Sequence, residues 1–519
     1  MIALLSIDGM AGGVALSLLF AGTAMVLQTR ERHRWALLAL SIAALVLRIT
    51  AAFLDPFLND WDEVFHAIVA KNMMAHPLTP MLYTETAMPL DGTWSRAHFW
   101  LHKPPFFLWQ MAISLKIFGL HVWAVRLPSV LWTTLLVPVV WRMGCLLRDQ
   151  WTGFVAATLA TFAYLLQELA SGALNTDHND AIFIATVACS WWAWLEFVRS
   201  PTWRWAAVAG LFAACAVFTK WYIGLSVFVP WGLWVLNGKF KPERVKGLLV
   251  AGGVMLLPVL AWIAHMVRWF PVEAAHEWSY KAEHFGTAMD GHRGTAMFHL
   301  DVIADLVPPF AWWIVLPAVA WLVWQTKLAA HRIFVVSLVV AIHIFFMLAQ
   351  TKMVCYTMVL FPLYAIAIGN ALRSICEALP WERYRQPLLV LATMALAYFT
   401  LDPERTQARH SIEPSPLADH RWRKQALEVM HDIPQLQQFV STAGKPVVFN
   451  MRMNHHLRYM FTTGIEAWAK LPSSEDVARL RAKGYTVFVL QDGAPQTSLP
   501  AGTRMVPDSV FAISHDMRL

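Results

Sequence analysis

Apolar stretches long enough to cross a lipid bilayer recur along most of this 519-residue chain. The hydrocarbon core of a bilayer requires roughly 20 apolar residues per helix. Because lipid offers no partner to free backbone N–H and C=O groups, such stretches must fold as helices. The composition agrees, since only 14% of the residues are charged, compared with about 25% in soluble domains. The sequence therefore predicts an all-α polytopic membrane protein.

We expect about twelve transmembrane helices, each with boundaries uncertain by a few residues. The expected spans lie near residues 11–28, 35–54, 122–146, 152–170, 181–198, 203–219, 221–237, 247–268, 309–326, 333–349, 354–372 and 386–401. The first span starts without Lys or Arg, which favours an uncleaved helix over a signal peptide.

Short basic loops separate alternate pairs of spans, and such loops mark the cytoplasmic side. These loops lie at residues 30–34, 142–148, 199–204, 239–246, 327–332 and 373–385. One orientation satisfies all of them, and it places residues 55–121, 171–180, 269–308 and the tail outside. The net charge of +7 therefore reflects membrane topology, and no nucleic-acid partner is expected.

The tail, residues 402–519, differs from the rest of the chain. KPVVFN and YTVFVLQ are typical of short buried strands, and SSEDVARLRAKGY has the capping residues of a helix start. We expect a transmembrane domain over residues 1–401, followed by a small C-terminal α/β extracytoplasmic domain over 402–519.

Ionisable residues gather in the outer loops rather than inside the spans, whereas transporters keep such residues near the bilayer midplane. The apolar spacing from Asp60 to Met74 predicts an amphipathic helix lying on the membrane, with Asp60 as its cap. Asp62 and Glu63 then stand near its N-terminus. They are candidates for catalysis, although serving only the cap and the helix dipole would also explain them.

A second amphipathic helix is predicted to start at Pro104 and Pro105. Lys103 precedes it, where a cation is unfavourable for the helix dipole unless it holds an anion. A phosphate bound by Lys103 and helix N–H groups fits, and a Lys reaching toward headgroups fits as well. Lys352 and Tyr356 lie one turn apart at another outer edge and could meet the same anion.

The other two outer loops also carry titratable residues. Asp177, His178 and Asp180 open a span, and three such residues exceed what a helix cap needs. In the third loop, Glu283, His284 and a later His could bind a divalent metal, but their spacing matches no specific template, and a solvated loop explains most of them.

In order along roughly residues 35–375, these segments resemble the GT-C membrane glycosyltransferases. The resemblance is strongest to the bacterial branch that includes the lipid A aminoarabinose transferase, related to protein O-mannosyltransferases. The segments that carry it are WDEVFHAIVAKNMM, LHKPPFFLWQMAISLKIFG, VRLPSVLW, NTDHNDAIF, FTKWYIGL and TKMVCYTMVLFPLYAIAIG.

The resemblance assigns roles residue by residue. Asp62 matches the family's catalytic carboxylate, Lys103 its carrier-phosphate ligand, and Asp177 its second-loop Asp. Tyr356 matches a phosphate contact, which Arg293 and Lys352 would assist. The aminoarabinose branch has an acid where this chain has His102; that acid joins a later His in a metal site. A metal, if bound here, would use His102 and His284.

These observations lead to the hypothesis of an inverting glycosyltransferase that moves a hexose or pentose from a polyprenyl-phosphate carrier to a hydroxyl acceptor. The acceptor would be lipid A, lipopolysaccharide, another glycan or a protein. The phosphate leaving group needs charge stabilisation more than a general acid, so no cofactor is required. The expected location is the bacterial inner membrane, with the active site on the periplasmic side. The alternative is a flippase of lipid-linked sugars without transfer activity.

Overall fold

The computed structural model describes residues 7–84, 88, 93–173, 177–307, 312–418, 421–451, 454–490 and 499–511. The chain forms two compact units. The membrane unit comprises Met1–Leu54, His102–Phe107 and Leu127–Pro403, and the tail unit comprises Asp55–Leu101, Leu108–Arg126 and Glu404–Leu519. The tail thus shares a unit with most of the first outer loop. A domain boundary at residue 401 stays a prediction.

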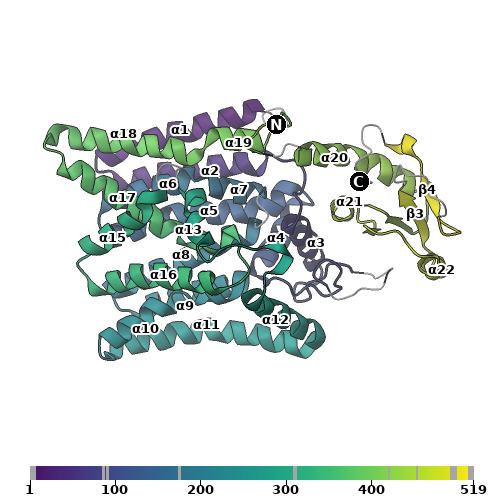
Figure 1. Ribbon diagram of the computed structural model, residues 1–519, viewed down its shortest axis with the longest axis horizontal. Coiled ribbons are helices and arrows are strands. Elements are labelled where there is room, and N and C mark those ends of the chain that lie inside the picture. The colour runs from purple at the N-terminus through teal and green to yellow at the C-terminus, as the bar shows by residue number, and fades with distance from the viewer. Residues whose placement is uncertain are drawn as a thin grey trace. The chain divides into compact units, whose positions relative to one another are not determined.

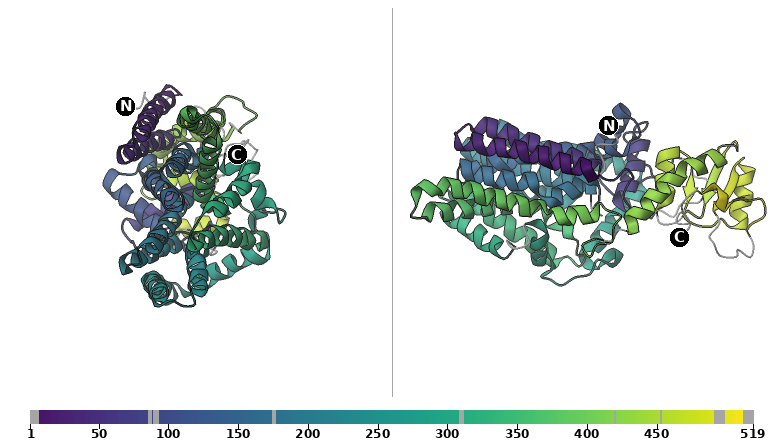
Figure 2. Two further views of the ribbon diagram at one scale, coloured as in Figure 1. Left: turned by 90° about the vertical axis from the view of Figure 1, so that its left-hand side faces the viewer. Right: turned by 90° about the horizontal axis from the view of Figure 1, so that it is seen from above.

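Helices that run roughly side by side build the membrane unit (Figures 1 and 2). In chain order they are α1 (Ile7–Thr29), α2 (His33–Ala52), α5 (Val122–Leu147), α6 (Gln150–Phe162), α7 (Tyr164–Ser171), α8 (Asp177–Arg199), α9 (Trp203–Lys220), α10 (Phe228–Asn237), α11 (Pro242–Trp269), α12 (Pro271–Gly286), α13 (Phe298–Asp301), α14 (Ile303–Leu306), α15 (Val315–Gln325), α16 (Ala329–Leu348), α17 (Phe361–Ala378) and α18 (Glu382–Leu401).

Among the described residues, eight helices are long and apolar enough to cross a membrane, or nine if the bent pair α6 and α7 is one span. The multi-pass helical membrane protein expected from the sequence is therefore confirmed, whereas a total of twelve spans stays a prediction. The expected spans 221–237 and 309–326 correspond to the short helices α10 and α15, and residues 309–311 lie outside the described residues. The span 386–401 corresponds to α18, which begins with the polar run ERYRQ.

A close helix approach at Gly210 and the buried cation Arg48 help to hold the bundle together. A Cβ at Gly210 would lie 2.2 Å from the carbonyl oxygen of Ala251, so glycine lets α9 and α11 approach closely, as is common between membrane helices. Arg48 of α2 is fully buried and donates to the carbonyl oxygens of Ala160 and Thr161. These carbonyls end α6, so Arg48 stabilises the 42° bend between α6 and α7.

The tail unit contains a four-stranded parallel sheet in the order β2-β1-β3-β4. Its strands are β1 (Pro446–Phe449), β2 (Ala467–Trp468), β3 (Thr486–Leu490) and β4 (Arg504–Val506), and its helices are α3 (Asp62–Met73), most of α4 (Phe106–Phe118), α19 (Pro403–Arg409), α20 (Arg421–Val440), α21 (His455–Thr463) and α22 (Ser474–Ala482). Val448 and Phe488 pack with Leu436 in one core. The strands and the helix expected in the tail are present, and Ser473 forms a capping box with Asp476.

Candidate functional site

In the membrane unit, cationic side chains gather around Lys103, which directly precedes the Pro104–Pro105 start expected for the second amphipathic helix. Lys103 is half-buried. Its positive charge contributes to lowering the pKa of Lys281 and of His284, although burial is the larger cause for both groups. Burial lowers the pKa of Lys281 to about 8, against the opposing charge of Glu277. The charge of Lys103 thus acts on both Lys281 and His284, and two lysines that affect each other in this way suit an anion.

Glu277 of α12 connects this cluster to His102. Its Oε2 lies 3.4 Å from His102 Nδ1 and 3.8 Å from Lys281 Nζ. Burial raises the pKa of Glu277, but the contributions of His102, Lys281 and His276 outweigh this rise, so the net shift is downward. Burial lowers the pKa of His102, and Glu277 only partly opposes this shift. Glu277 therefore stays a carboxylate that orients His102 and Lys281.

Aromatic contacts extend the cluster toward His284. The Tyr280 ring lies 5.6 Å from the ring of His102 and 5.0 Å from that of His284, between centroids. The Tyr280 hydroxyl donates to Asp290 at 2.6 Å, and His284 Nδ1 lies 3.2 Å from the hydroxyl of Thr351. His102 and His284, the two metal candidates, thus flank one tyrosine.

A partly buried ion pair joins α8 and α9 in the same unit. Lys220 Nζ, at the end of α9, is 2.5 Å from Asp180 Oδ1 in α8. The same ammonium lies 5.7 Å from the centre of the Tyr356 ring. Tyr356 stacks on Phe346 at 4.5 Å. The expected phosphate contact Tyr356 is therefore held in place by an aromatic stack and a cation.

The backbone is strained directly after Lys220. Trp221 has φ 55° and ψ −121°, a conformation that costs a non-glycine residue about 1–3 kcal/mol. Lys281 Nζ lies 5.1 Å from the centre of the Trp221 ring, an attractive cation–π distance. Strain of this kind often occurs at functional sites. Because Trp221 follows Lys220 and contacts Lys281, this residue joins the ion pair of Lys220 to the cluster around Lys281.

Lys352 is not placed as expected. It is 5% exposed, and its Nζ donates to the carbonyl oxygens of Phe346, Met347 and Ala349 at 2.8, 2.9 and 2.5 Å. An ammonium has three donor hydrogens, so all three can be satisfied at the end of α16. Lys352 therefore closes a helix end instead of facing an anion beside Tyr356. Arg293, the other expected helper, is exposed.

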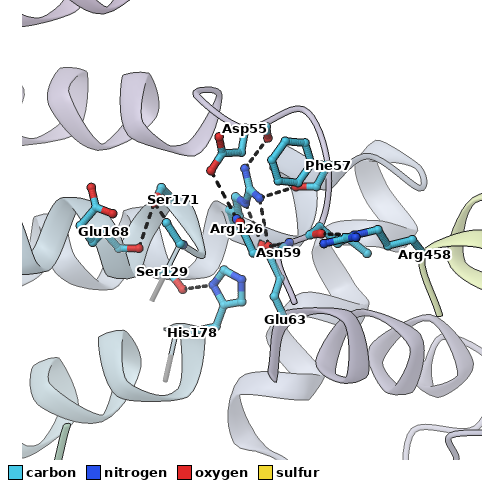
Figure 3. A network of polar contacts seen from close by, with 12 residues as sticks. Asp55, Phe57, Asn59, Glu63, Arg126, Ser129, Glu168, Ser171, His178 and Arg458 are labelled. Atoms are coloured by element: carbon cyan, nitrogen blue, oxygen red, sulfur yellow. Dashed lines mark hydrogen bonds and ion pairs between the residues drawn. The ribbon is translucent and has the colours of Figure 1, made fainter. Parts of the chain in front are cut away.

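The start of α8 is anchored from within the membrane unit. His178 is fully buried, and its Nδ1 lies 2.7 Å from the hydroxyl of Ser129 in α5 (Figure 3). Asp177 is the first residue of α8, and nothing is described of its side chain. His178 thus fixes the backbone that carries Asp177.

In the tail unit, Glu63 is completely buried and paired with Arg126 (Figure 3). Arg126 Nε and Nη2 bind the two carboxylate oxygens at 2.7 and 3.0 Å. The other bonds of Arg126 go to the carbonyl oxygens of Asp55 and Phe57. The backbone N–H of Asn59 also donates to Glu63 at 2.6 Å. These contacts give Glu63 a positioning function, to hold the turn before α3.

Asp62 begins α3 and is half-buried, in contrast to its neighbour Glu63. The residue before it, Trp61, has φ 63° and ψ −127° and provides no side-chain cap. Asp60, expected to cap this helix, instead lies 2.8 Å from Nη2 of Arg458. Burial raises the pKa of Asp60, and the charge and hydrogen bond of Arg458 oppose that rise.

Within the described ranges, no three His, Cys, Asp or Glu side chains are grouped so that they could hold a metal ion. His102 meets Glu277, and His284 meets Thr351.

Sequence reasoning missed the residues whose partners lie far away along the chain. Lys220, Arg48 and Arg126 occur inside or beside apolar stretches, and charges at such positions indicate function or a specific partner. That signal was available for each residue. The partners Asp180, Ala160 and Glu63 lie 40, 112 and 63 positions away, which the sequence pattern does not specify.

Comparisons with known proteins agree with this architecture. The family model of dolichyl-phosphate-mannose-protein mannosyltransferases matches residues 102–263. A crystal structure of ArnT from Cupriavidus metallidurans bound to undecaprenyl phosphate superposes with a TM-score of 0.62 at 15% identity, over 86% of this chain and 87% of that one. This chain has the GT-C fold. The apo oligosaccharyltransferase of the archaeon Archaeoglobus fulgidus shares the GT-C fold with it at a TM-score of 0.54 and 11% identity, over 84% of this chain and 64% of that one.

Curated relatives of this chain carry names from the branch that the sequence segments resemble. An undecaprenyl phosphate-alpha-4-amino-4-deoxy-L-arabinose arabinosyl transferase of Pseudomonas fluorescens is 24% identical over 304 residues, which are 55% of this chain and 53% of the relative. The chain thus spans about half the length of that relative. The resemblance seen in the sequence segments is confirmed.

Proposed function

We propose that this chain is an inverting glycosyltransferase that moves a sugar from a polyprenyl-phosphate carrier to a hydroxyl of a cell-envelope acceptor. The observation that carries the proposal is the cationic cluster around Lys103 and Lys281 in a unit built of membrane helices. A phosphate needs cations, and a polyprenyl chain needs lipid. The similarity to an arabinosyl transferase and to ArnT bound to undecaprenyl phosphate supports the same class of donor.

In the proposed reaction, the acceptor oxygen attacks the anomeric carbon as the bond from that carbon to the carrier phosphate breaks. The phosphate leaves with the bonding electrons. Lys103, Lys281 and the Tyr356 hydroxyl would stabilise its charge, since donors fixed in advance at the site of developing charge lower the barrier most. Asp62 would take the proton of the acceptor hydroxyl as general base. One direct displacement inverts the anomeric centre, and no carboxylate nucleophile is needed.

We also propose the cellular setting that the basic loops indicate. The protein would lie in the bacterial inner membrane, with Asp62 and the cationic cluster on the periplasmic side, and would cross the membrane about twelve times. Asp177 would position the acceptor. The proposed reaction uses no cofactor. A divalent ion, if one binds, would use His102, which lies beside Glu277, and His284.

The test measures sugar transfer by the purified full chain, reconstituted in proteoliposomes. Polyprenyl-phosphate hexoses and pentoses would be offered with lipid A, lipopolysaccharide or a peptide, and products identified by mass spectrometry. The expected result is a glycosylated acceptor with the anomeric configuration opposite to the donor. Carrier that crosses the vesicle bilayer but stays uncleaved would overturn the transferase and indicate a flippase.

A further inference from the structure

Within the tail unit, α21 holds α3 at both ends. Near the start of α3, Arg458 lies 2.8 Å from Asp60. Near its end, Lys71 Nζ donates to the carbonyl oxygens of Met460 and Phe461 at 2.9 and 2.8 Å. These carbonyls belong to the last turns of α21, where a cation is favourable. Two charged contacts, separated by the length of α3, therefore fix this helix against α21.

The guanidinium of Arg458 makes polar contacts with three residues of the tail unit. Its side chain is 2% exposed. Its Nε donates to the carbonyl oxygen of Leu58 at 2.6 Å, Nη2 meets Asp60, and Nη1 lies 2.8 Å from Nδ1 of His455. The planar guanidinium thus holds two residues of the turn that leads into α3, and His455 holds the guanidinium.

The turn before α3 needs contacts from other parts of the tail unit to keep its conformation. Trp61 follows it at φ 63° and ψ −127°, and such a conformation persists only where the surroundings determine it. On one side, Glu63 accepts the N–H of Asn59. On the other, Arg458 binds the residues before and after Asn59, namely Leu58 and Asp60. Asp62 directly follows the strained Trp61. The orientation of its side chain therefore depends on the contacts that Glu63 and Arg458 make with the turn.

We propose that α21, through Arg458, is the element that aims Asp62, which makes the C-terminal segment part of the transfer apparatus and Arg458 a positioning residue. The inference rests on the proposed function, because it assigns the purpose of the hold to the base Asp62. It goes beyond that function in giving the tail a specific task. Charge alone is insufficient for this task, because one planar fork must reach Leu58 and Asp60 together.

The experiment compares Arg458→Gln, Arg458→Lys and the control Arg481→Gln, which alters an exposed arginine of α22. Hydrogen exchange of the peptide covering residues 55–74 is measured first, because it needs no substrate. We expect faster exchange in Arg458→Gln, a smaller increase in Arg458→Lys and none in the control. Unchanged exchange in Arg458→Gln would overturn the hold.

Kinetics then test the purpose of the hold, with rates expressed per folded molecule. We expect Arg458→Gln to lower kcat by about 10- to 100-fold, since a misplaced reacting group costs rate even when binding is intact. KM for the polyprenyl-phosphate sugar should change less than about twofold, and Arg458→Lys should recover part of the rate. A normal kcat in Arg458→Gln, or a loss confined to KM, would overturn the inference. Wild-type protein without transfer would overturn the proposed function instead, and exchange alone would then decide whether Arg458 holds the turn.

Discussion

The guanidinium of Arg126 binds both carboxylate oxygens of Glu63, with Nε 2.7 Å from Oε1 and Nη2 3.0 Å from Oε2. Both side chains are fully buried. Removing one partner of such a pair leaves a buried charge without compensation, at a cost of about 3–5 kcal/mol. Breaking this pair should therefore cost more than breaking an ion pair at the surface.

We expect Arg126→Met to reduce the free energy of unfolding in detergent by that amount, because the Glu63 carboxylate would stay buried alone. The control is Arg148→Gln, which breaks the half-exposed pair with Glu377 and should cost less than about 1 kcal/mol. Thermal unfolding followed by loss of monodisperse protein measures both variants. Equal losses in the two variants would contradict a special role for the buried pair.

Asp62→Asn should abolish most turnover and leave donor binding intact. The amide keeps the size of the side chain but cannot accept the acceptor proton, and general-base catalysis is worth about 100- to 10,000-fold. Initial rates and polyprenyl phosphate affinity are measured together. Glu475→Gln, at an exposed position of α22, serves as the control and should be active. A near-normal rate in Asp62→Asn would remove Asp62 as the base.

Lys103→Ala and Lys352→Ala should affect different properties, donor binding and thermal stability, although both remove one lysine. Loss of Lys103 should weaken polyprenyl phosphate binding about 10-fold or more, because a hydrogen bond between charged groups is lost. Loss of Lys352 should instead lower thermal stability, since the carbonyl groups of Phe346 and Met347 in α16 and of Ala349 directly after it lose their partner. Donor titration and unfolding on both variants separate the two roles. Reduced donor affinity in Lys352→Ala at unchanged stability would reverse the assignment.

The amount that the sequence could predict differs among these residues. Long apolar stretches predicted the membrane helices, Pro104–Pro105 predicted the start of α4 to within two residues, and capping residues predicted α22. These features depend on neighbouring positions in the sequence. The position of Lys103 before the two prolines also indicated an anion site. In contrast, one turn of spacing suggested that Lys352 and Tyr356 share a ligand, but backbone carbonyls within six residues of Lys352 compete for its ammonium.

The sequence could not predict contacts between residues that lie far apart along the chain. Asp60 looked like a helix cap because its sequence neighbours are those of a helix start. Its partner Arg458 lies almost 400 positions away along the chain. The same guanidinium also binds the carbonyl oxygen of Leu58, across 400 positions. A local sequence pattern cannot show whether Asp60 caps α3 or pairs with a distant arginine. In the structure, it pairs with the buried Arg458.

Lys281 predicts how donor affinity depends on pH. Burial lowers its pKa to about 8, so its charged fraction falls from about nine-tenths at pH 7 to about one-tenth at pH 9. A phosphate bound to the ammonium favours the charged form, and binding above pH 8 must therefore take up a proton. Affinity for polyprenyl phosphate should then fall about 10-fold from pH 7 to pH 9. The second ionisation of the phosphate, near a pKa of about 6, is largely complete at pH 7 and does not produce this fall. Lys281→Arg keeps its charge throughout this range and should show constant affinity. Equal pH profiles for the wild type and Lys281→Arg would show that Lys281 does not bind the phosphate.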